Sequence, residues 1–484
     1  MSTDRTIAEL PGPRGLPLVG SAHKLVPMSR SHLVFEQWAR RYGPIFRVKV
    51  GPRMVVAIDD EEAINAILRD RPAGFRRWRN IPEVIQEINE AAPQMRGTPP
   101  ALFAAEGEEW KRQRRLVVTA LNKDHLHRYF GVVRTATKRL HRRLLAEARA
   151  SEAVAISEAL TAYTVDVTSA LAFGHDLNTL EHGDGELQRH IQRMLVASGH
   201  RITAAVPYWR WLKLPSDRAL DRSMVEVYRA TEGFIGRAQA RMEARPELFE
   251  QPENLIEGLL AAQRADPSFS DQEIAGNLIT VLLAGEDTTA HTLGWTIWLL
   301  GSRPDVQEHL RDEAATAFGR DPIPAEYAMA EQLPYAEAVL RESMRLKSVA
   351  PTAGVEPNED RTICDTHIPA GTQLLLLMRR ATRAAAGRSE DFYPERWLED
   401  SEETRAPKSL SFGAGPRFCP GRNLAFLEAK AALGTLARNF EIELDESGQP
   451  VRESFGFTMV PDGLRVRLRE RRDRSQATAG LAAT

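Results

Sequence analysis

The feature that most constrains the fold is an unbroken helical pattern that runs from Ser270 to about Ser302, just before Pro304. It begins with a capping box, in which Ser270 and Glu273 can each accept a hydrogen bond from the other's backbone N–H. At about 1.5 Å per residue such a helix is roughly 50 Å long, enough to cross a whole globular molecule. The sequence therefore predicts a fold built around one long central helix.

The middle of this helix contains residues that helices do not favour. The run AGEDTT over residues 284–289 places Gly285, Asp287 and Thr288 in the helix interior, where Gly costs about 1 kcal/mol relative to Ala and Asp and Thr are weak formers. Thr288 can bond back to the carbonyl of Ala284, and Gly285 has no side chain, so we expect the helix to open here and admit dioxygen or water. A broken local rule of this kind often marks a functional site.

The rest of the chain is mainly α, with small β-sheets (α+β). Ala, Leu, Glu and Arg at helical spacing dominate residues 60–345. A β-hairpin is predicted from residues 45–50 and 54–58, and short β-like runs return at residues 363–368, 373–378, 457–460 and 464–468. No repeat or linker divides the chain. We expect a flexible leader over residues 1–10, one integrated domain over 11–468 and a disordered tail over 469–484.

Composition excludes several classes of protein. Lys and Arg number 64 against 66 Asp and Glu, and the net charge of -2 gives no global reason to bind nucleic acid or an anionic membrane. Two cysteines, Cys364 and Cys419, cannot build a disulfide framework, a four-cysteine zinc site or an iron–sulfur cluster. The amino terminus is polar, and the longest aliphatic stretch, residues 374–378, is far shorter than the ~20 residues of a membrane span. These features predict a cytoplasmic protein.

Cys419 lies in the loop FGAGPRFCPG over residues 412–421, which is rich in glycine and proline. Such a loop can direct backbone N–H groups at the sulfur, and the following helical pattern adds its positive end, so both effects favour a thiolate. No histidine base for a nucleophilic cysteine is specified, and no further Cys or His follows at zinc spacing. What remains is a single thiolate that binds heme iron, and the absence of Cys-x-x-Cys-His indicates a heme without covalent attachment. Cys364 lacks this context and is interpreted as a small buried residue.

These motifs together resemble the cytochrome P-450 superfamily, the heme-thiolate monooxygenases, in its soluble bacterial type. The family's cysteine loop, Phe-x-x-Gly-x-Arg-x-Cys-x-Gly, is matched by Phe412, Gly415, Arg417, Cys419 and Gly421. Four more matches occur in the family's order: Trp110-x-x-x-Arg114, the AGEDTT run, Glu342-x-x-Arg345 and Pro394-Glu395-Arg396. The resemblance spans residues 11–468 and implies the cytochrome P-450 fold with heme b as cofactor.

The resemblance also implies how the heme is held. Cys419 is the iron ligand, and Phe412 and Gly421 belong to the loop that binds the cofactor. Trp110, Arg114 and Arg417 form a clamp for the heme propionates. The family often has another propionate-binding arginine shortly after Glu-x-x-Arg, but residues 351–356 contain none.

Two further groups receive roles by resemblance. Asp287 and Thr288 correspond to the acid–alcohol pair that relays protons to iron-bound dioxygen. Glu342 and Arg345, joined by Arg396, form a buried network that holds the scaffold of the cysteine loop and takes no part in the chemistry. From the residues alone, Glu342 and Arg345 could equally be a surface ion pair.

The family's substrate pocket corresponds here to mostly apolar positions: Met95, Leu102, Phe103, Ala284, Gly285, Thr352, Ala353 and Phe457. We therefore expect a hydrophobic small molecule as substrate, such as a fatty acid, terpenoid, steroid or polyketide. The chain has no room for a flavin domain, and two cysteines cannot build a ferredoxin centre, so electrons are expected from a separate ferredoxin and ferredoxin reductase. The expected docking residues are Lys111, Arg112, Arg115 and Arg422.

Three alternatives remain open at this point. One is a heme enzyme of the same fold driven by peroxide, which the presence of Asp287 and Thr288 disfavours. A second is a non-catalytic heme sensor or carrier, which would keep Cys419 but need no proton relay. The third is nucleic-acid binding through an arginine-rich segment interleaved with aromatic residues, which the balanced net charge disfavours: Arg69, Arg71, Phe75, Arg76, Arg77, Trp78 and Arg79.

Overall fold

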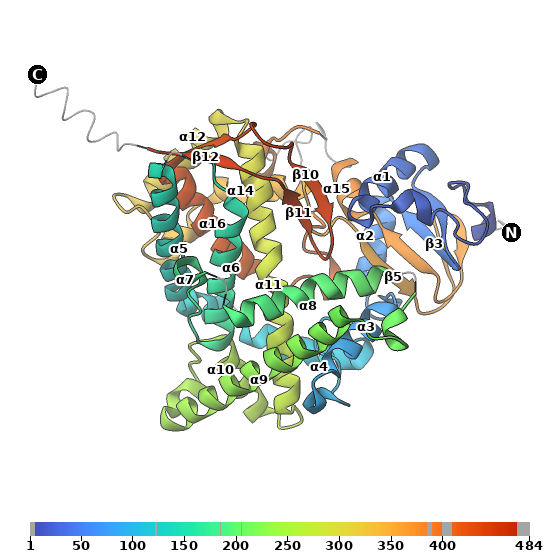
Figure 1. The fold of residues 1–484 in the computed structure, drawn as a ribbon, viewed down its shortest axis with the longest axis horizontal. Helices are drawn as coiled ribbons and strands as arrows, with labels where there is room; N and C mark the ends of the chain where they lie inside the picture. Colours follow the sequence, from blue (N-terminus) through green and yellow to red (C-terminus); the bar gives the residue numbers. More distant parts are fainter. Residues whose placement is uncertain are drawn as a thin grey trace, which may run out of the picture.

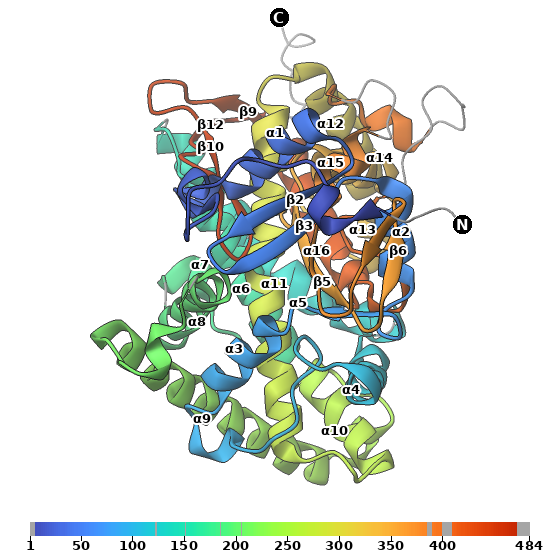
Figure 2. The same cartoon turned by 90° about the vertical axis from the view of Figure 1, so that its right-hand side faces the viewer.

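The structure is a computed structural model that describes residues 5–121, 123–150, 152–183, 185–204, 206–384, 390–398 and 409–471. Helices make up most of it, as the sequence predicts (Figures 1 and 2). They are α1 (Ser31–Tyr42), α2 (Glu61–Arg69), α3 (Asn80–Asn89), α4 (Gly107–Ala120), α5 (Lys123–Ala150), α6 (Ile156–Phe173), α7 (Thr179–His182), α8 (Glu186–Thr203), α9 (Pro215–Ala244), α10 (Leu255–Ala265), α11 (Asp271–Leu300), α12 (Pro304–Phe318), α13 (Tyr327–Glu331), α14 (Pro334–Leu346), α15 (Met378–Ala384) and α16 (Arg422–Asn439).

The strands form small mixed sheets. They are β1 (Arg5–Thr6), β2 (Ile45–Val50), β3 (Arg53–Ile58), β4 (Phe75–Arg77), β5 (Ala353–Pro357), β6 (Arg361–Ile363), β7 (Thr366–Ile368), β8 (Gln373–Leu376), β9 (Phe440–Leu444), β10 (Arg452–Phe455), β11 (Met459–Asp462) and β12 (Val466–Glu470). The largest sheet has the order β2-β3-β8-β5-β4, and β3 and β8 run parallel within it. The smaller sheets have the orders β1-β7-β6, β10-β11 and β12-β9.

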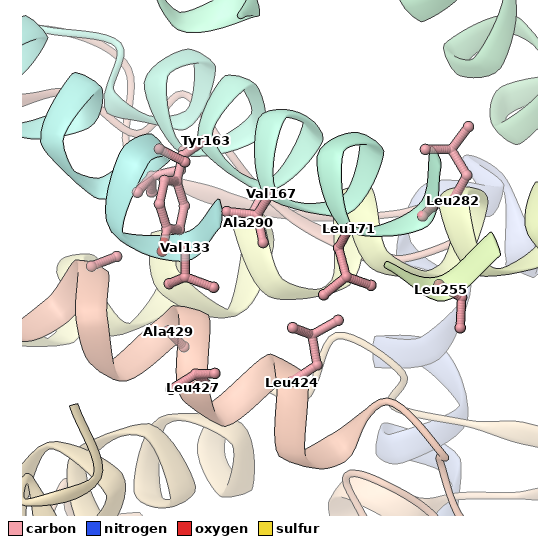
Figure 3. Close-up of a cluster of buried hydrophobic side chains, with 14 of the residues drawn as sticks. Val133, Tyr163, Val167, Leu171, Leu255, Leu282, Ala290, Leu424, Leu427 and Ala429 are labelled. Atoms are coloured by element: carbon pink, nitrogen blue, oxygen red, sulfur yellow. The ribbon is translucent and has the colours of Figure 1, made fainter. Parts of the chain in front are cut away.

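Helix α11 crosses the molecule from one end to the other, as Figure 2 shows. The predicted capping box is present: the Ser270 hydroxyl accepts a hydrogen bond from the Glu273 N–H, and the Glu273 carboxylate accepts one from the Ser270 N–H. Helix α11 packs against α6 and α16 through buried apolar side chains such as Val167, Ala290 and Leu427 (Figure 3). Because α11 is packed on several sides, its backbone is held in place. The side chains at its middle are therefore held in fixed positions, as a functional site requires.

The hairpin predicted at residues 45–58 is confirmed by the antiparallel pairing of β2 with β3. Residues 5–10 differ from the predicted flexible leader, because Arg5 and Thr6 pair in parallel with β7 and Leu10 is buried. Residues 1–4, and residues 472–484 of the predicted tail, lie outside the described residues, whereas residues 469 and 470 belong to β12. No helix within the described ranges combines the length and hydropathy that a bilayer crossing requires.

Candidate active site

Glycines shape the loop that presents Cys419. Gly413 and Gly415 have φ angles of +72° and +67°, in the left-handed region that glycine tolerates best. A Cβ atom at Gly415 would lie 2.5 Å from the carbonyl oxygen of Leu68, so only glycine allows the loop to pack so closely on α2. The Cys419 N–H donates to the Phe412 carbonyl at 2.9 Å and closes the loop. The sulfur is thus held just before the amino end of α16.

The surroundings of the Cys419 sulfur differ in one respect from the prediction. Burial raises the pKa of the Cys419 thiol, and this effect exceeds the lowering of the pKa by the N–H groups of Gly421 and Arg422 and by the charge of Arg114. The predicted N–H groups are present and lower the pKa of the thiol, as the sequence predicts, but burial has the larger effect. A cation bonded to the sulfur stabilises the anion far more strongly than amide groups do, so the loop suits a metal ligand.

Of the two predicted propionate-clamp arginines, Arg417 lies within this loop and Arg114 lies beside it. Arg417 donates to Glu106 at 2.6 Å and stacks over the Trp110 ring, with its guanidinium carbon 4.8 Å from the ring centroid. Its side chain is only 3% exposed, yet its Nε and Nη1 atoms have no hydrogen-bond partner. Arg114 donates to the carbonyl of Phe418 at 2.7 Å and lies over the ring of the same residue.

Arg71, which is buried, and Arg77, which is partly buried, add two cations that the sequence did not point to as heme contacts. Arg71 is 6% exposed, and its Nε and Nη2 atoms also have no partner. Burial, reinforced by repulsion from Arg77 and Arg417, lowers the pKa of Arg71 to about 9. Burial likewise lowers the pKa of Arg417 to about 10, and Glu106 is the carboxylate that opposes both shifts.

This cluster of Arg71, Arg77, Arg114 and Arg417 therefore holds more cations than carboxylates. Buried N–H donors without partners are costly, and a planar guanidinium is suited to bind carboxylates. Heme b has two propionate carboxylates, which are the groups that such a cluster lacks. The residues present thus fit the cofactor that Cys419 predicts, and the inward-facing Arg71 and Arg77 leave little of the arginine-rich segment for nucleic acid.

One residue in the middle of α11 is exposed between buried and partly buried neighbours. Ala284 is exposed, although Leu282 and Glu286 are buried. The Thr288 hydroxyl donates to the Ala284 carbonyl at 2.8 Å, as the sequence suggests, but α11 stays α-helical through this turn, so the expected opening is absent. Gly285 has a packing role, because a Cβ there would lie 2.8 Å from the Thr168 hydroxyl oxygen on α6.

Asp287 is partly buried, three residues after the exposed Ala284. Burial raises the pKa of Asp287, and His291 on the next turn of α11 opposes the rise. A carboxyl with a raised pKa keeps its proton to a higher pH than usual, so it can act as a proton donor closer to neutrality.

Glu342, Arg345 and Arg396 come together as a fully buried network. Arg345 donates to both carboxylate oxygens of Glu342 at 2.9 and 2.8 Å, and Arg396 donates to the same carboxylate at 3.0 Å. The Trp397 indole and the Tyr393 N–H donate to it as well, at 2.9 and 3.0 Å. The side chains of the three charged residues are at most 1% exposed. The alternative of a surface ion pair is therefore excluded.

Some of the predicted pocket residues lie near one another. The rings of Phe103 and Phe457 meet with their centroids 6.2 Å apart, and the Phe457 N atom lies close to Gly199 of α8. Met95 is buried and packs on α11 at Gly276. Thr352 and Ala353 are partly buried, and Ala353 begins β5. Their role towards a substrate remains a prediction.

The cysteine loop, the arginine cluster and the central helix define a heme-thiolate protein. A profile of the family described as Cytochrome P450 matches residues 10–468. The chain belongs to the cytochrome P450 family: it is a monooxygenase of the oxidoreductase class, and its cofactor is heme b.

The curated relatives cover nearly the whole chain. Cytochrome P450 27C1 of Danio rerio is 26% identical, over 96% of this chain and 87% of the relative. The mitochondrial 25-hydroxyvitamin D-1 alpha hydroxylase of Homo sapiens is 28% identical, over 95% and 92%. The chloroplastic Protein LUTEIN DEFICIENT 5 of Arabidopsis thaliana is 26% identical, over 89% and 72%. The organelles in these names overturn the expected cytoplasmic location, because the charge and hydropathy of a folded enzyme do not encode its compartment.

Proposed function

We propose that this enzyme inserts one oxygen atom of dioxygen into a hydrophobic small molecule and reduces the other atom to water. The observation that carries the proposal is the apolar contact between Phe103 and Phe457, in an enzyme whose central helix leaves Ala284 exposed. The name of the human relative, a hydroxylase of 25-hydroxyvitamin D, supports a substrate of this polarity. An apolar lining determines polarity more than identity, because one methylene changes affinity by only about 1 to 3 kcal/mol.

In this proposal, separate groups of residues bind the cofactor, transfer protons and support the cysteine loop. Heme b, bound through the Cys419 thiolate, supplies the iron that activates dioxygen. Arg71, Arg77, Arg114 and Arg417 neutralise the propionates and fix the cofactor in the fold. Asp287 holds a proton near the exposed Ala284 of α11, and Thr288 is the adjacent hydroxyl that passes it on. Glu342, Arg345 and Arg396 keep the scaffold of the cysteine loop rigid.

The first prediction concerns substrate class. The purified enzyme is titrated with dodecanoic acid, camphor, progesterone and a macrolide lactone, and binding is followed by the change in heme spin state. We expect at least one of these compounds to bind and to gain one labelled atom from ¹⁸O₂ when NADPH, a ferredoxin and its reductase are added. Thr288→Ala is expected to retain binding but to convert less of the NADPH into product. Product without label, or equal product from Thr288→Ala, would contradict the proposal.

We further propose that the electron donor is a ferredoxin, which docks at the cysteine-loop face. Phe418 is 45% exposed and Arg115 is exposed on α4, next to the Arg114 that contacts Phe418. Of the other expected docking residues, Lys111 is exposed and pairs with Glu108 at 2.6 Å, and Arg422 is partly buried. Arg112 pairs with Glu109 and with the buried Glu273.

The second prediction therefore uses Arg115 alone. Arg115→Glu is expected to slow reduction by a ferredoxin roughly tenfold at low ionic strength, because charge steering raises association rates by at least that factor. The difference should shrink as salt screens the charge. Stopped-flow absorption of the heme measures the rate, and Arg229→Glu on α9, an arginine whose side chain is 66% exposed, is the control. Equal rates for Arg115→Glu and the parent would rule out Arg115 as a docking residue.

A further inference from the structure

His291 lies one helical turn after Asp287, on the same face of α11, since residues separated by four positions are neighbours on a helix surface. Its ring is 8% exposed, and its Nδ1 atom is 2.9 Å from the hydroxyl oxygen of Thr458. This hydrogen bond fixes the ring and connects α11 to the loop between β10 and β11. His291 is thus a buried titratable residue held in a fixed position, one turn from an acid of the predicted active site.

The loop that holds the ring also reaches the predicted pocket. Phe457 precedes Thr458 and contacts Phe103. The hairpin is fastened to α11 a second time, by the Trp295 indole N–H that donates to the Met459 carbonyl at 2.9 Å. His291 is therefore in contact with the segment that presents Phe457.

Other acidic groups near this turn of α11 bond other residues. Glu428 of α16 is buried and accepts a hydrogen bond from the Thr289 hydroxyl. Glu286, which precedes Asp287, is buried and bonds Gln188 of α8. The carboxylate of Glu453 on β10 forms hydrogen bonds with three side chains, those of His32, Lys347 and Arg379. Among the described residues, Asp287 is the charged group that acts on the His291 ring, and His291 is the one that acts on Asp287.

We propose that His291 is a positioning residue for Asp287: the two side chains form one titrating pair, which Thr458 ties to the loop that presents Phe457. This inference rests on the role of Asp287 in the proposed function. Burial raises the pKa of Asp287 and lowers the pKa of His291, and each group opposes the shift of the other. A protonated ring thus favours the Asp287 carboxylate, so proton exchange at Asp287 depends on His291.

Coupling between two sites is reciprocal, which makes the pair testable from both sides. Removing the carboxylate in Asp287→Asn is expected to lower the pKa of His291 by about one unit, the lower end of the effect of a close opposite charge. Removing the ring charge in His291→Gln, whose amide can still bond Thr458, is expected to raise the pKa of Asp287 by a similar amount.

The experiment is an NMR titration of the holoenzyme with ¹³C-labelled histidine, reduced and bound to carbon monoxide so that the heme is diamagnetic. The His291 signal among the 12 histidines is identified by its loss in His291→Gln. Asp287 is followed by the infrared band of its protonated carboxyl, identified by its loss in Asp287→Asn. Asp360→Asn, which alters a surface aspartate 3.6 Å from His367, is the control and should leave the His291 titration unchanged.

Shifts of about one unit in both variants would support the pair. An unchanged His291 titration in Asp287→Asn, or an unchanged Asp287 band in His291→Gln, would overturn it. The titration needs neither substrate nor ferredoxin, so a failure of this inference is distinguishable from a failure of the proposed function, which would show as equal product formation by Thr288→Ala and the parent.

Discussion

Replacing Cys419 by serine is expected to abolish both the heme-thiolate spectrum and the oxygenation reaction. Serine has nearly the same size, so the loop that Gly413 and Gly415 shape can keep its path. A hydroxyl, however, is a much weaker donor to iron than a thiolate, and it gives up its proton far less readily. The variant should therefore fold and still contain the arginine cluster, but without the ligand that defines the chemistry.

The measurement is the absorption spectrum of the reduced, carbon monoxide-bound protein, together with product formation in the ¹⁸O₂ assay. Cys364→Ser is the matched control, because Cys364 is the other cysteine of the chain and packs at the edge of a separate apolar cluster near β6 and β7. It should behave as the parent in both assays. A Cys419→Ser spectrum indistinguishable from that of the parent would show that the sulfur of Cys419 does not bind the iron.

The site could be predicted where its signal is local in the chain. The cysteine loop occupies residues 412–421, and the capping box of α11 lies within residues 270–273, so each is visible in a single short window. The buried network of Glu342, Arg345 and Arg396 has no such local signal. Glu342 and Arg396 are separated by 54 positions, and nothing in either segment requires the two side chains to be in contact. The family resemblance, and not the residue pattern, predicted their contact.

Arg71 and Arg77 show most clearly why the rest could not be predicted. They lie in an arginine-rich segment that has the composition of a solvated or nucleic-acid-binding face. The position of Arg77 depends on the pairing of β4 with β5, which joins residues 75–77 to residues 355–357. Strand β5 itself has a weak sequence signal, because it contains Gly354 and ends in Pro357, and Gly354 is needed where the Trp78 ring approaches its backbone.

The fold shows the same division between local and distant determinants. The unbroken helical pattern and capping box of α11 and the β2–β3 hairpin depend on neighbours in sequence, and both elements were predicted with nearly correct bounds. Strand β1 depends instead on β7, some 360 positions away, so a polar amino-terminal segment that reads as a leader becomes ordered by pairing. A short strand that forms only by pairing with a distant strand need not show an alternation of apolar and polar residues. Its own segment then gives no signal from which it could be predicted.

Replacing Glu342 by glutamine is expected to destabilise the enzyme more than any other single change considered. The carboxylate accepts hydrogen bonds from Arg345, Arg396, Tyr393 and Trp397, and it carries the charge that balances two buried guanidinium groups. Glutamine has the same shape but no charge. Its amide nitrogen is a hydrogen-bond donor, and here it would face the N–H groups that donate to the Glu342 carboxylate. Breaking a buried ion pair from one side leaves a desolvated charge and costs about 3–5 kcal/mol.

The free energy of unfolding, obtained from urea titration followed by tryptophan fluorescence, should fall by about that amount in Glu342→Gln. Glu226→Gln is the matched control, because Glu226 pairs with Arg229 at 2.5 Å on the surface of α9, where both side chains are largely exposed. Such a pair contributes less than about 1 kcal/mol. Replacing the network as a whole, with Glu342→Leu, Arg345→Met and Arg396→Met together, is expected to be less damaging than Glu342→Gln, because no buried charge is then left without a partner. Equal losses for Glu342→Gln and Glu226→Gln would mean that the carboxylate of Glu342 does not carry the stability of this scaffold.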